Sequence, residues 1–419
     1  ASPASRTVPT TRPPERKPMA NFPCADCGAQ LTYSPGTARM TCPYCGAEND
    51  LPDADTGPWD DPRTALVERD LAETLAALAR ADRGEVGAIE TTRIIRCGAC
   101  GAEVGFEGGR DGNATATSTA ARTLADNCPF CASPLSLEAA HDHRHPAPQG
   151  VLPFAIAERA ARGALKDWLA SRWFAPSDLK KFAEASRPIN GVYVPHYTYD
   201  ALATSDYRGQ RGDAYYVTQW VTVTENGKSV RRQRQVRKIR WSRVSGRVQQ
   251  FFDDVLVPAT GTLTEFTQDA TVDGHTDWDL DGMAGYNASF LAGFRAEAPS
   301  LPLGDGFQRA STAMEQVMRG VVRADIGGDE QRISAMSTRY DRVTFKHVLL
   351  PVWLAAYRYR NQPYRVVVNG RTGRVTGERP YSWIKIALAV LAVLVLLGVL
   401  YLVGSAEIAD SLGPPPSLR

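Results

Sequence analysis

The longest uninterrupted apolar run in the chain lies near its C-terminus. Positions 384–403 read "IKIALAVLAVLVLLGVLYLV", in which Lys385 is the only charged residue. At 1.5 Å per residue, a helix of this length spans about 30 Å, the thickness of the hydrocarbon core of a bilayer. A buried helix of a soluble protein is rarely so uniformly aliphatic. The pattern therefore predicts a transmembrane helix over 384–404, followed by a short tail over 405–419.

The region before this helix combines helical and alternating patterns. Two stretches at its beginning, "AERAARGALKDWLASRW" and "PSDLKKFAEAS", have the spacing of amphipathic helices, and Ser177 is placed to cap the second. A further helix is expected near 305–323. The alternating stretches include "YYVTQWVTVTENGKSVRRQRQVRKIRWSRVSG", which predicts a long hairpin with Asn226-Gly227 at its turn. Together these patterns predict a β-rich α+β body over 150–380.

Two segments of the body resemble each other. "VYVPHYTYDALATSDYRGQRG" at 192–212 and "VLLPVWLAAYRYRNQPYRVVVNGRTG" at 348–373 each run from a proline through aromatic strand positions to a glycine turn. An internal duplication explains the likeness, and so do two unrelated edge hairpins, because proline favours strand starts and sheet edges. The second segment contains a turn at Asn369-Gly370, which predicts at least two closing strands.

A shorter helix is predicted nearer the N-terminus, within 57–85. In "DDPRTALVERDLAETLAALARA" the leucines recur at helical spacing, with Asp61 placed as the N-cap and Pro62 as the first helical residue. This amphipathic pattern favours a linking helix that packs between two modules over a helix that binds a partner.

Cysteines occur in pairs on both sides of this helix. The chain contains eight, every one in a Cys-x-x-Cys pair, and all are candidate metal ligands: Cys24, Cys27, Cys42, Cys45, Cys97, Cys100, Cys128 and Cys131. Residues 1–20 contain no apolar signal segment, so the thiols are expected in a reducing compartment. In such a compartment paired cysteines indicate metal binding rather than disulfides.

Each cysteine unit fits a four-thiolate zinc site. The first has fourteen residues between its pairs, with a turn at Ser34-Pro35-Gly36, and predicts a zinc ribbon over 21–50. The second has 27 residues between its pairs, including the polar "GGRDGNATATSTA", which we interpret as a loop inserted in a second ribbon over 91–138. Two structural Zn²⁺ sites are expected, because four protein thiolates leave no open coordination position. A rubredoxin-like iron site and a catalytic dithiol are the alternatives.

Three histidines follow the second unit in "HDHRH". Alternating histidines on an extended segment can bind a metal, but such a short polar run is more often a solvated linker. We therefore expect His141, His143 and His145 to lie in a linker before the body.

Composition predicts a chain that is folded over most of its length. Its 419 residues allow two or three folded units, and 43% of them are hydrophobic and 22% charged. Residues 1–20 are rich in proline, serine, threonine and arginine, so a disordered arm is expected there. The formal net charge is only +2, so attraction to polyanions would need a local patch.

Charges beside the apolar run are asymmetric. Cations precede or begin the run and acids follow it, the residues being Arg371, Arg374, Arg379 and Lys385, then Glu407 and Asp410. Because the positive side of a membrane helix stays in the cytoplasm, the bulk of the chain is expected in the cytosol and the helix in the bacterial inner membrane. Tyr381, Trp383 and Tyr401 are typical of membrane–water interfaces.

The segment 231–247, "RRQRQVRKIRWSRVSGR", concentrates positive charge. Its cations are Arg231, Arg232, Arg234, Arg237, Lys238, Arg240, Arg243 and Arg247. The simplest interpretation is the solvated face of an exposed strand, where cations discourage edge pairing. Anionic lipids attract cations by about 1 kcal/mol each near a membrane surface, so lipid or an acidic partner is expected here ahead of nucleic acid.

The sequence lacks the motifs of nucleotide-binding and hydrolytic enzymes. "ENGKS" at 225–229 is not a Walker A loop, because Thr222 stands where its first glycine belongs. Neither a His-Glu-x-x-His helix nor a Gly-x-Ser-x-Gly elbow occurs. We interpret the carboxylates of Asp253-Asp254 and of "DWDLD" at 277–281 as turn and surface groups, and we expect no enzyme.

Several strings together resemble one family. They are the cysteine units, "INGVYVPHYTYDA", "YRGQRG", "FDDVLVPA", "TFKHVLLPVWLAAYRY", "VNGRTGRVTGERP" and the apolar run. Over roughly residues 21–404 the chain resembles bacterial membrane proteins with a TFIIB-type zinc ribbon, often labelled primosomal protein N′ (replication factor Y), a superfamily II helicase. The missing nucleotide motifs argue against ATPase activity. The resemblance implies a membrane scaffold that acts alongside SPFH (stomatin/flotillin-like) and phage-shock-protein-A-like proteins.

We therefore expect a non-enzymatic, cytosol-facing membrane adaptor. Its zinc ribbons would serve as docking modules and its body as a second interaction surface. The alternative is a membrane-tethered nucleic-acid binder, because zinc ribbons and basic strands also suit that task.

Overall fold

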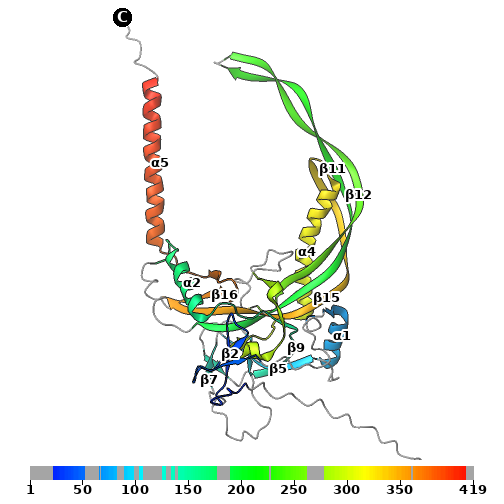
Figure 1. The fold of residues 1–419 in the computed structure, drawn as a ribbon. Helices are drawn as coiled ribbons and strands as arrows, with labels where there is room; N and C mark the ends of the chain where they lie inside the picture. Colours follow the sequence, from blue (N-terminus) through cyan, green and yellow to red (C-terminus); the bar gives the residue numbers. More distant parts are fainter. Residues whose placement is uncertain are drawn as a thin grey trace, which may run out of the picture.

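The computed structural model describes residues 22–51, 66, 68–82, 89–98, 103–106, 125–128, 134–136, 140–176, 189–225, 228–261, 278–359 and 362–411. These residues form a mixed, strand-rich α+β fold around one large sheet, whose main path is β12-β11-β15-β10-β13. Figure 1 shows this sheet as a platform from which a long curved hairpin and the C-terminal helix rise in the same general direction. The α+β class predicted from the sequence is confirmed.

Three long strands form the centre of the sheet. β11 (Asn190–Glu225) and β12 (Lys228–Pro258) make an antiparallel hairpin, and β15 (Glu330–Tyr359) pairs antiparallel with the other edge of β11. Glu225 pairs with Lys228, so the hairpin predicted from the sequence is confirmed; its two turn residues lie outside the described residues. β11 is longer than the alternating stretch of sequence predicts, because the aromatic segment that precedes this stretch belongs to the same strand.

The outer part of the hairpin extends beyond the third strand. β15 begins at Glu330, opposite Gly212. Residues 213–225 and 228–240 therefore pair only with each other within the described part of the chain. We call this two-stranded segment the outer ribbon. A two-stranded ribbon has little core and depends on its cross-strand side-chain pairs.

Two central strands contain proline, which favours sheet edges. Pro195 and Pro351 both lie within the antiparallel pairing of β11 with β15. β12 ends at Pro258, which pairs with His196. Pro195 therefore lies just beyond the last β11–β12 pair, where the missing N–H of proline interrupts no strand hydrogen bond with β12. The two look-alike segments are therefore adjacent strands of one sheet, and their interpretation as edge hairpins is wrong.

One long helix covers the inner part of these strands. α4 (Leu303–Ile326) packs on the sheet through buried residues at four-residue spacing: Gly306, Ala310, Met314, Met318 and Val322. A Cβ at Gly306 would lie 2.3 Å from the hydroxyl of Tyr199, so glycine permits this close approach. That hydroxyl donates a hydrogen bond to the carbonyl of Leu303 at 2.8 Å. The helix predicted near 305–323 is confirmed.

The helix between the cysteine units begins later than predicted. Arg69–Asp70 form the short strand β4, which pairs with β15, and α1 (Leu71–Asp82) follows directly. Oδ1 of Asp70 accepts a hydrogen bond from the amide of Glu73 at 2.8 Å, so Asp70 is the N-cap. The predicted start is therefore wrong: "DLAE" supplies a cap directly after the sheet contact, and Asp61 lies outside the described residues.

Shorter elements complete the platform. The helix predicted in "AERAARGALKDWLASRW" is confirmed as α2, whereas the one capped by Ser177 lies outside the described residues. Phe154 stacks on Phe294 with ring centroids 4.4 Å apart, in a core that includes Tyr193 and Trp353. The elements are α2 (Glu158–Ala170), η2 (Leu280–Gly282), η3 (Ala288–Leu291), β10 (Gly150–Val151), β13 (Ala284–Gly285), β14 (Arg295–Ala296), β16 (Gln362–Asn369) and β17 (Val375–Gly377). The C-terminal helix that rises from the platform is α5 (Trp383–Ser411).

The N-terminal part forms three small sheets. The order β1-β2-β3 makes the first, β6-β5-β9 the second and β7-β8 the third. Their strands are β1 (Thr32–Ser34), β2 (Arg39–Thr41), β3 (Glu48–Asp50), β5 (Ile89–Arg96), β6 (Glu103–Phe106), β7 (Ala125–Asn127), β8 (Pro134–Ser136) and β9 (Ala140–Pro146).

The interpretation of the histidine run as a solvated linker is wrong. "HDHRH" lies in β9, which pairs antiparallel with β5, and His145 is buried. Its ring lies edge-on to His347 with centroids 5.9 Å apart, and Nδ1 of each donates to the carbonyl of Pro146. The alternation itself is a strand pattern that turns His145 inward. The side chains of His141 and His143 lie outside the description.

A buried ion network lies at an irregularity of the central strands. The pairing of β11 with both neighbours shifts register beside Asp200, and Asp254 has a φ of 48°. Nζ of Lys346 lies 2.8 Å from Asp254, 3.2 Å from Glu68 and 3.7 Å from Asp200, measured to carboxylate oxygens. Asp254 keeps a side chain that is 38% exposed, as expected of a surface group, but this carboxylate also pairs with the buried Lys346 ammonium, which the sequence did not predict.

The pKa values of two carboxyl groups in this network move in opposite directions. Burial and a hydrogen bond with Glu68 raise the pKa of Asp200 to about 7. Burial acts on Glu68 in the same direction, but hydrogen bonds with Asp200 and Thr344 and the Lys346 charge lower its pKa to about 2. Asp253 brings a third carboxylate oxygen within 4.8 Å of these two. Because the Lys346 ammonium already pairs with Glu68, Asp200 and Asp254, we assign the cluster a structural role.

Replacing Lys346 with methionine is expected to destabilise the fold by about 3 kcal/mol, because the change leaves the buried Asp200 carboxylate without its cation, whereas Glu68 and Asp254 are partly exposed to solvent. Thermal unfolding of the full chain in detergent, followed by tryptophan fluorescence, measures the effect. Lys238→Met is the matched control, because Lys238 is exposed on the outer ribbon. Equal unfolding temperatures for the two variants would contradict a structural role of the network.

Candidate metal centre and membrane helix

Two loops of the same local design present the first four cysteines. In each loop a glycine amide donates to the carbonyl of the first cysteine: Gly28 to Cys24 at 2.9 Å, and Gly46 to Cys42 at 3.0 Å. Both glycines have positive φ, +72° and +76°. Residues with a Cβ rarely adopt that conformation. The "CADCG" and "CPYCG" strings therefore encode two equivalent turns that each direct a pair of thiols to one side.

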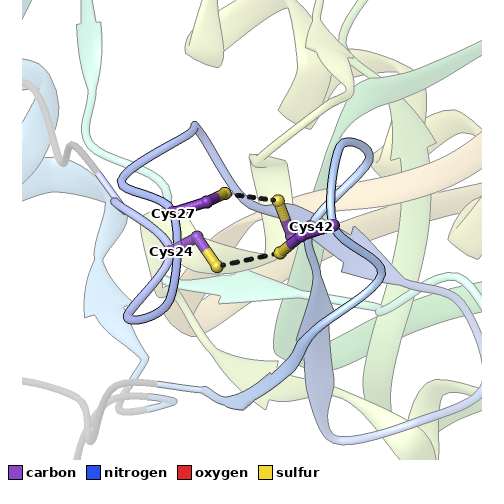
Figure 2. Close-up of side chains that lie close together, drawn as sticks. Cys24, Cys27 and Cys42 are labelled. Carbon is purple, nitrogen blue, oxygen red and sulfur yellow. Dashed lines mark hydrogen bonds between the residues drawn. The ribbon is translucent and has the colours of Figure 1, made fainter.

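The four sulfurs converge between these loops. Cys24 Sγ lies 3.6 Å from Cys45 Sγ, Cys27 Sγ lies 3.5 Å from Cys42 Sγ, and all four lie within 4.8 Å of one another. Figure 2 shows Cys24 and Cys27 on one loop facing Cys42 on the other. Sulfurs bound at about 2.3 Å to a tetrahedral Zn²⁺ lie about 3.8 Å apart, so this set fits the ion. Thiolates select zinc or iron over hard cations such as Mg²⁺.

The environment favours the thiolate at the first cysteine of each pair. The backbone amide of Cys45 leads the hydrogen bonds that lower the pKa of Cys42 to about 6. The pKa of Cys24 is lowered in the same way, led by the amide of Cys27. At Cys45 the amide of Ala47 favours the thiolate, but contacts with two neighbouring thiols raise its pKa to about 12. A bound divalent cation would favour the thiolate at all four positions.

This first ribbon is packed on the platform. The ring of Tyr33, in β1, is buried against Phe290 with centroids 5.3 Å apart, and its amide donates to the carbonyl of Ala292 at 2.9 Å. At the tip of the hairpin the amide of Gly36 donates to the carbonyl of Phe154 at 2.8 Å. The hairpin turn is thus held by the body. Its metal-binding end is formed by the two cysteine loops.

The second cysteine unit is described in part. Cys97 follows β5 and Cys128 follows β7, and both side chains are buried. Cys100, Cys131 and the polar segment between the pairs lie outside the described residues. Four neighbouring sulfurs are therefore described for the first unit, and the second ribbon stays a prediction.

The C-terminal helix has the length and composition of a membrane span. Its window Trp383–Tyr401 has a mean hydropathy of 2.7, and none of it is buried within the described part of the protein. In Figure 1 this helix, α5, stands away from the platform above α2. A helix that leaves nineteen residues of this kind in water would expose an apolar surface far larger than soluble proteins tolerate.

Exposed aromatic side chains lie on the two segments that meet at the start of α5. Trp173 and Phe174, from the loop after α2, and Tyr381 and Trp383, at the start of α5, are all exposed. Hydrogen bonds hold the two segments together: the Ser382 amide donates to the Phe174 carbonyl at 2.7 Å. We call these four residues the aromatic collar. The sequence shows only its second half, because the two segments lie about two hundred residues apart.

The basic segment lies on β12 and reaches the outer ribbon. Two of its arginines form salt bridges, at 2.9 and 2.7 Å, and two lie over aromatic rings of β11, at 5.3 and 5.7 Å from the ring centroids. The pairs are Arg237 with Glu330, Arg247 with Asp206, Arg240 with Tyr215 and Arg231 with Trp220. Arginines stacked on exposed rings can bind anionic headgroups or nucleic acid.

Comparison with known proteins gives one distant relative. Over 252 residues the chain is 23% identical to a Bacillus subtilis (strain 168) protein described as "Uncharacterized protein YdjG". The aligned part covers 58% of this chain and 67% of YdjG. No protein-family model matches the chain, and no solved structure matches it. The similarity to YdjG assigns no activity, so function is argued from the sites themselves.

Proposed function

We propose that this protein is a non-enzymatic adaptor anchored in the bacterial inner membrane by α5, with its platform and ribbons in the cytosol. The observation that carries the proposal is the exposed apolar helix with the aromatic collar at its first turn. Tryptophan and tyrosine concentrate at the level of lipid headgroups, so the collar marks the height at which the platform meets the bilayer.

The direction of insertion follows from charge. Arg371, Arg374 and Arg379 lie on the platform side of α5, and Lys385 lies in its first turn. Nζ of Lys385 donates to the carbonyls of Trp173 and Ala175, which keeps this cation at the platform end. The positive-inside rule then places the platform in the cytosol.

Two structural zinc ions, one in each cysteine unit, complete the proposal. The first unit supports it with four converging sulfurs, and the second with the same Cys-x-x-Cys pairs. Four protein ligands leave no position for a substrate, which suits a scaffold rather than a catalyst. Tyr44, in the second cysteine loop, is 82% exposed, and we propose it as a contact for a protein partner.

The outer ribbon constrains how the platform sits on the membrane. The hairpin and α5 rise in the same general direction (Figure 1), yet a ribbon rich in arginine does not enter hydrocarbon. We propose that α5 tilts at its first turn, so that the outer ribbon lies along the anionic headgroup layer.

The resemblance implies SPFH-type or phage-shock-protein-A-like membrane proteins as partners. The test purifies the tagged full chain from detergent-solubilised bacterial membranes and quantifies such proteins in the eluate. Tyr44→Ala should reduce their recovery severalfold, whereas Tyr216→Ala, an exposed tyrosine of the outer ribbon, should not. Failure to recover a protein of either class would overturn this choice of partner.

A membrane-tethered nucleic-acid binder is the second candidate, favoured by the arginine–aromatic pairs of the outer ribbon. Nuclease-sensitive nucleic acid in the same eluate, with a steep loss of binding in salt, would establish it.

The full chain is expected to hydrolyse no ATP, with or without single-stranded DNA, because its sequence has no Walker A loop. A phosphate-release assay on the detergent-purified protein measures this. DNA-stimulated hydrolysis that Lys228→Met abolishes, while Lys238→Met does not, would contradict the non-enzymatic proposal.

A further inference from the structure

A pocket of about 460 Å³ lies beside the first turn of α5. Trp168 and Arg172, at and just after the end of α2, line one side, and β17 with Glu378, Arg379 and Tyr381 lines the other. The volume lies within the range of small-ligand sites. The pocket joins two segments that are distant in sequence, so sequence analysis gives no signal for it.

Two arginines in this pocket are positioned on aromatic rings. The guanidinium carbon of Arg172 lies 4.9 Å from the centroid of Trp168, and that of Arg379 lies 5.2 Å from the centroid of Tyr381. Stacking on a ring fixes the plane of a guanidinium and leaves its edge for hydrogen-bond acceptors. Both sides of the pocket therefore present a planar cation of fixed orientation.

One donor in the pocket has no acceptor among the described residues. Nε of Arg172 is shielded from solvent and forms no hydrogen bond within the described structure. A buried donor without an acceptor is costly, so this nitrogen is available, within the described structure, to an acceptor that a ligand would bring. A phosphate oxygen is the acceptor that arginine binds best.

The charge of the pocket limits the ligand. Two arginines and Glu378 leave a lining of one net positive charge, and the Glu378 carboxylate also accepts a hydrogen bond from the Arg365 amide at 3.3 Å. A phosphodiester carries one negative charge and matches this lining. Free phosphate is more highly charged near neutral pH and would be opposed by the carboxylate.

The position of the pocket identifies the source of the phosphodiester. Tyr381 belongs both to the pocket lining and to the aromatic collar, and α5 begins two residues later, at Trp383. If the collar lies at the headgroup layer, the pocket opens where lipid phosphates lie, and acyl chains can continue along the exposed face of α5.

We propose that this pocket binds the headgroup phosphodiester of an anionic phospholipid through Arg172 and Arg379. The inference rests on the proposed membrane anchoring by α5. It is independent of the basic outer ribbon, which would contact the membrane elsewhere. Such a bound lipid would fix the loop after α2 to the start of α5 and so fix the tilt of the platform.

The test counts lipids on the full chain. Protein purified in detergent from the membrane fraction is mixed with phosphatidylglycerol or phosphatidylcholine and analysed by native mass spectrometry. Wild type should retain one phosphatidylglycerol in preference to phosphatidylcholine, because both lipids carry the phosphodiester but the choline cation would be opposed by the net positive lining. Arg172→Gln combined with Arg379→Gln should weaken this binding about tenfold or more, because two charge-assisted hydrogen-bonding groups are lost.

Controls separate this site from other causes. Arg159→Gln, an exposed arginine on the same helix, and Arg234→Gln on the outer ribbon should retain the lipid. The single variant Arg379→Gln, in the loop before α5, repeats the lipid-binding measurement with the α2 side of the pocket unchanged. Unchanged lipid retention in both pocket variants would overturn the proposal, and so would displacement of the lipid by inorganic phosphate.

The outcome is distinguishable from failure of membrane anchoring. Wild type and the double variant should both sediment with membranes before extraction, because α5 is intact in both. A soluble wild-type chain would instead refute the anchoring by α5, whatever lipid binds afterwards.

Discussion

Replacing Cys42 with serine is expected to remove the metal from the first ribbon and to unfold residues 22–51. The ribbon has a small apolar core, formed mainly by Leu31 and Met40 together with the cysteines Cys24 and Cys42. Apparent zinc-binding free energies of about 10–16 kcal/mol exceed what such a core contributes, so metal binding supplies most of the folding energy. Loss of one of four thiolates removes a large part of it.

The effect should reach the platform, because the ribbon is joined to it. Tyr33 belongs to the platform core with Phe154, Tyr193 and Trp353. Unfolding of the ribbon would expose this core, so we expect rapid tryptic cleavage at Arg39 and a lower unfolding temperature for the whole chain. Limited proteolysis and tryptophan fluorescence measure the two effects.

Tyr44→Ala is the matched control for Cys42→Ser. Tyr44 lies in the same loop and is exposed, and it is not one of the converging cysteines. This variant should keep its metal and resist trypsin as wild type does. A Cys42→Ser chain that also resists trypsin would show that the ribbon folds without its metal.

Deletion of residues 384–404 is expected to move the protein from the membrane fraction to the soluble fraction. The deleted segment includes almost all of the exposed apolar window, and the proposed anchoring depends on the burial of this window in lipid. Deletion of the tail, 405–419, should leave the protein in the membrane. Fractionation followed by alkaline carbonate extraction measures both variants.

Topology is tested in the same cells. A protease added to intact spheroplasts should leave residues 1–380 uncut, because the proposed orientation has these residues in the cytosol. Cleavage of the first ribbon by the added protease would contradict the proposed cytosolic orientation. A truncated protein that still sediments with membranes would show that another surface, such as the outer ribbon, supplies the attachment.

Local patterns predict several elements of this molecule. The first cysteine unit, the hairpin and α5 each depend on residues close together in sequence: "CADCG" and "CPYCG", an Asn-Gly turn, and an unbroken aliphatic run. The structure places four sulfurs, a two-residue connection and an exposed helix at these positions. These elements are predictable because the residues that determine each of them are close together in the sequence.

Features that depend on distant partners were not predictable. Lys346 meets Glu68, Asp200 and Asp254 only because β15 lies beside β11 and β4, so each residue alone resembles a surface charge. His145 is buried for a similar reason, since β9 carries it against His347. The burial of an isolated charge or of a polar run depends on which strand pairs beside it, and the local sequence does not specify that strand.

The first residue of α1 also depends on a tertiary contact. Two acidic residues, Asp61 and Asp70, precede the same helical pattern, and either can cap a helix. The choice of Asp70 follows from the pairing of β4 with β15, which is a tertiary contact.

Metal analysis of the membrane-bound protein asks whether the first ribbon holds a metal while the platform is anchored in the membrane. The full chain is extracted from washed membranes with detergent, and its metals are quantified per chain by mass spectrometry. We expect zinc, at two ions per chain, in protein that only detergent releases. Iron in place of zinc, or a metal-free folded chain in the membrane, would contradict the proposal of zinc-held ribbons on a membrane-anchored platform.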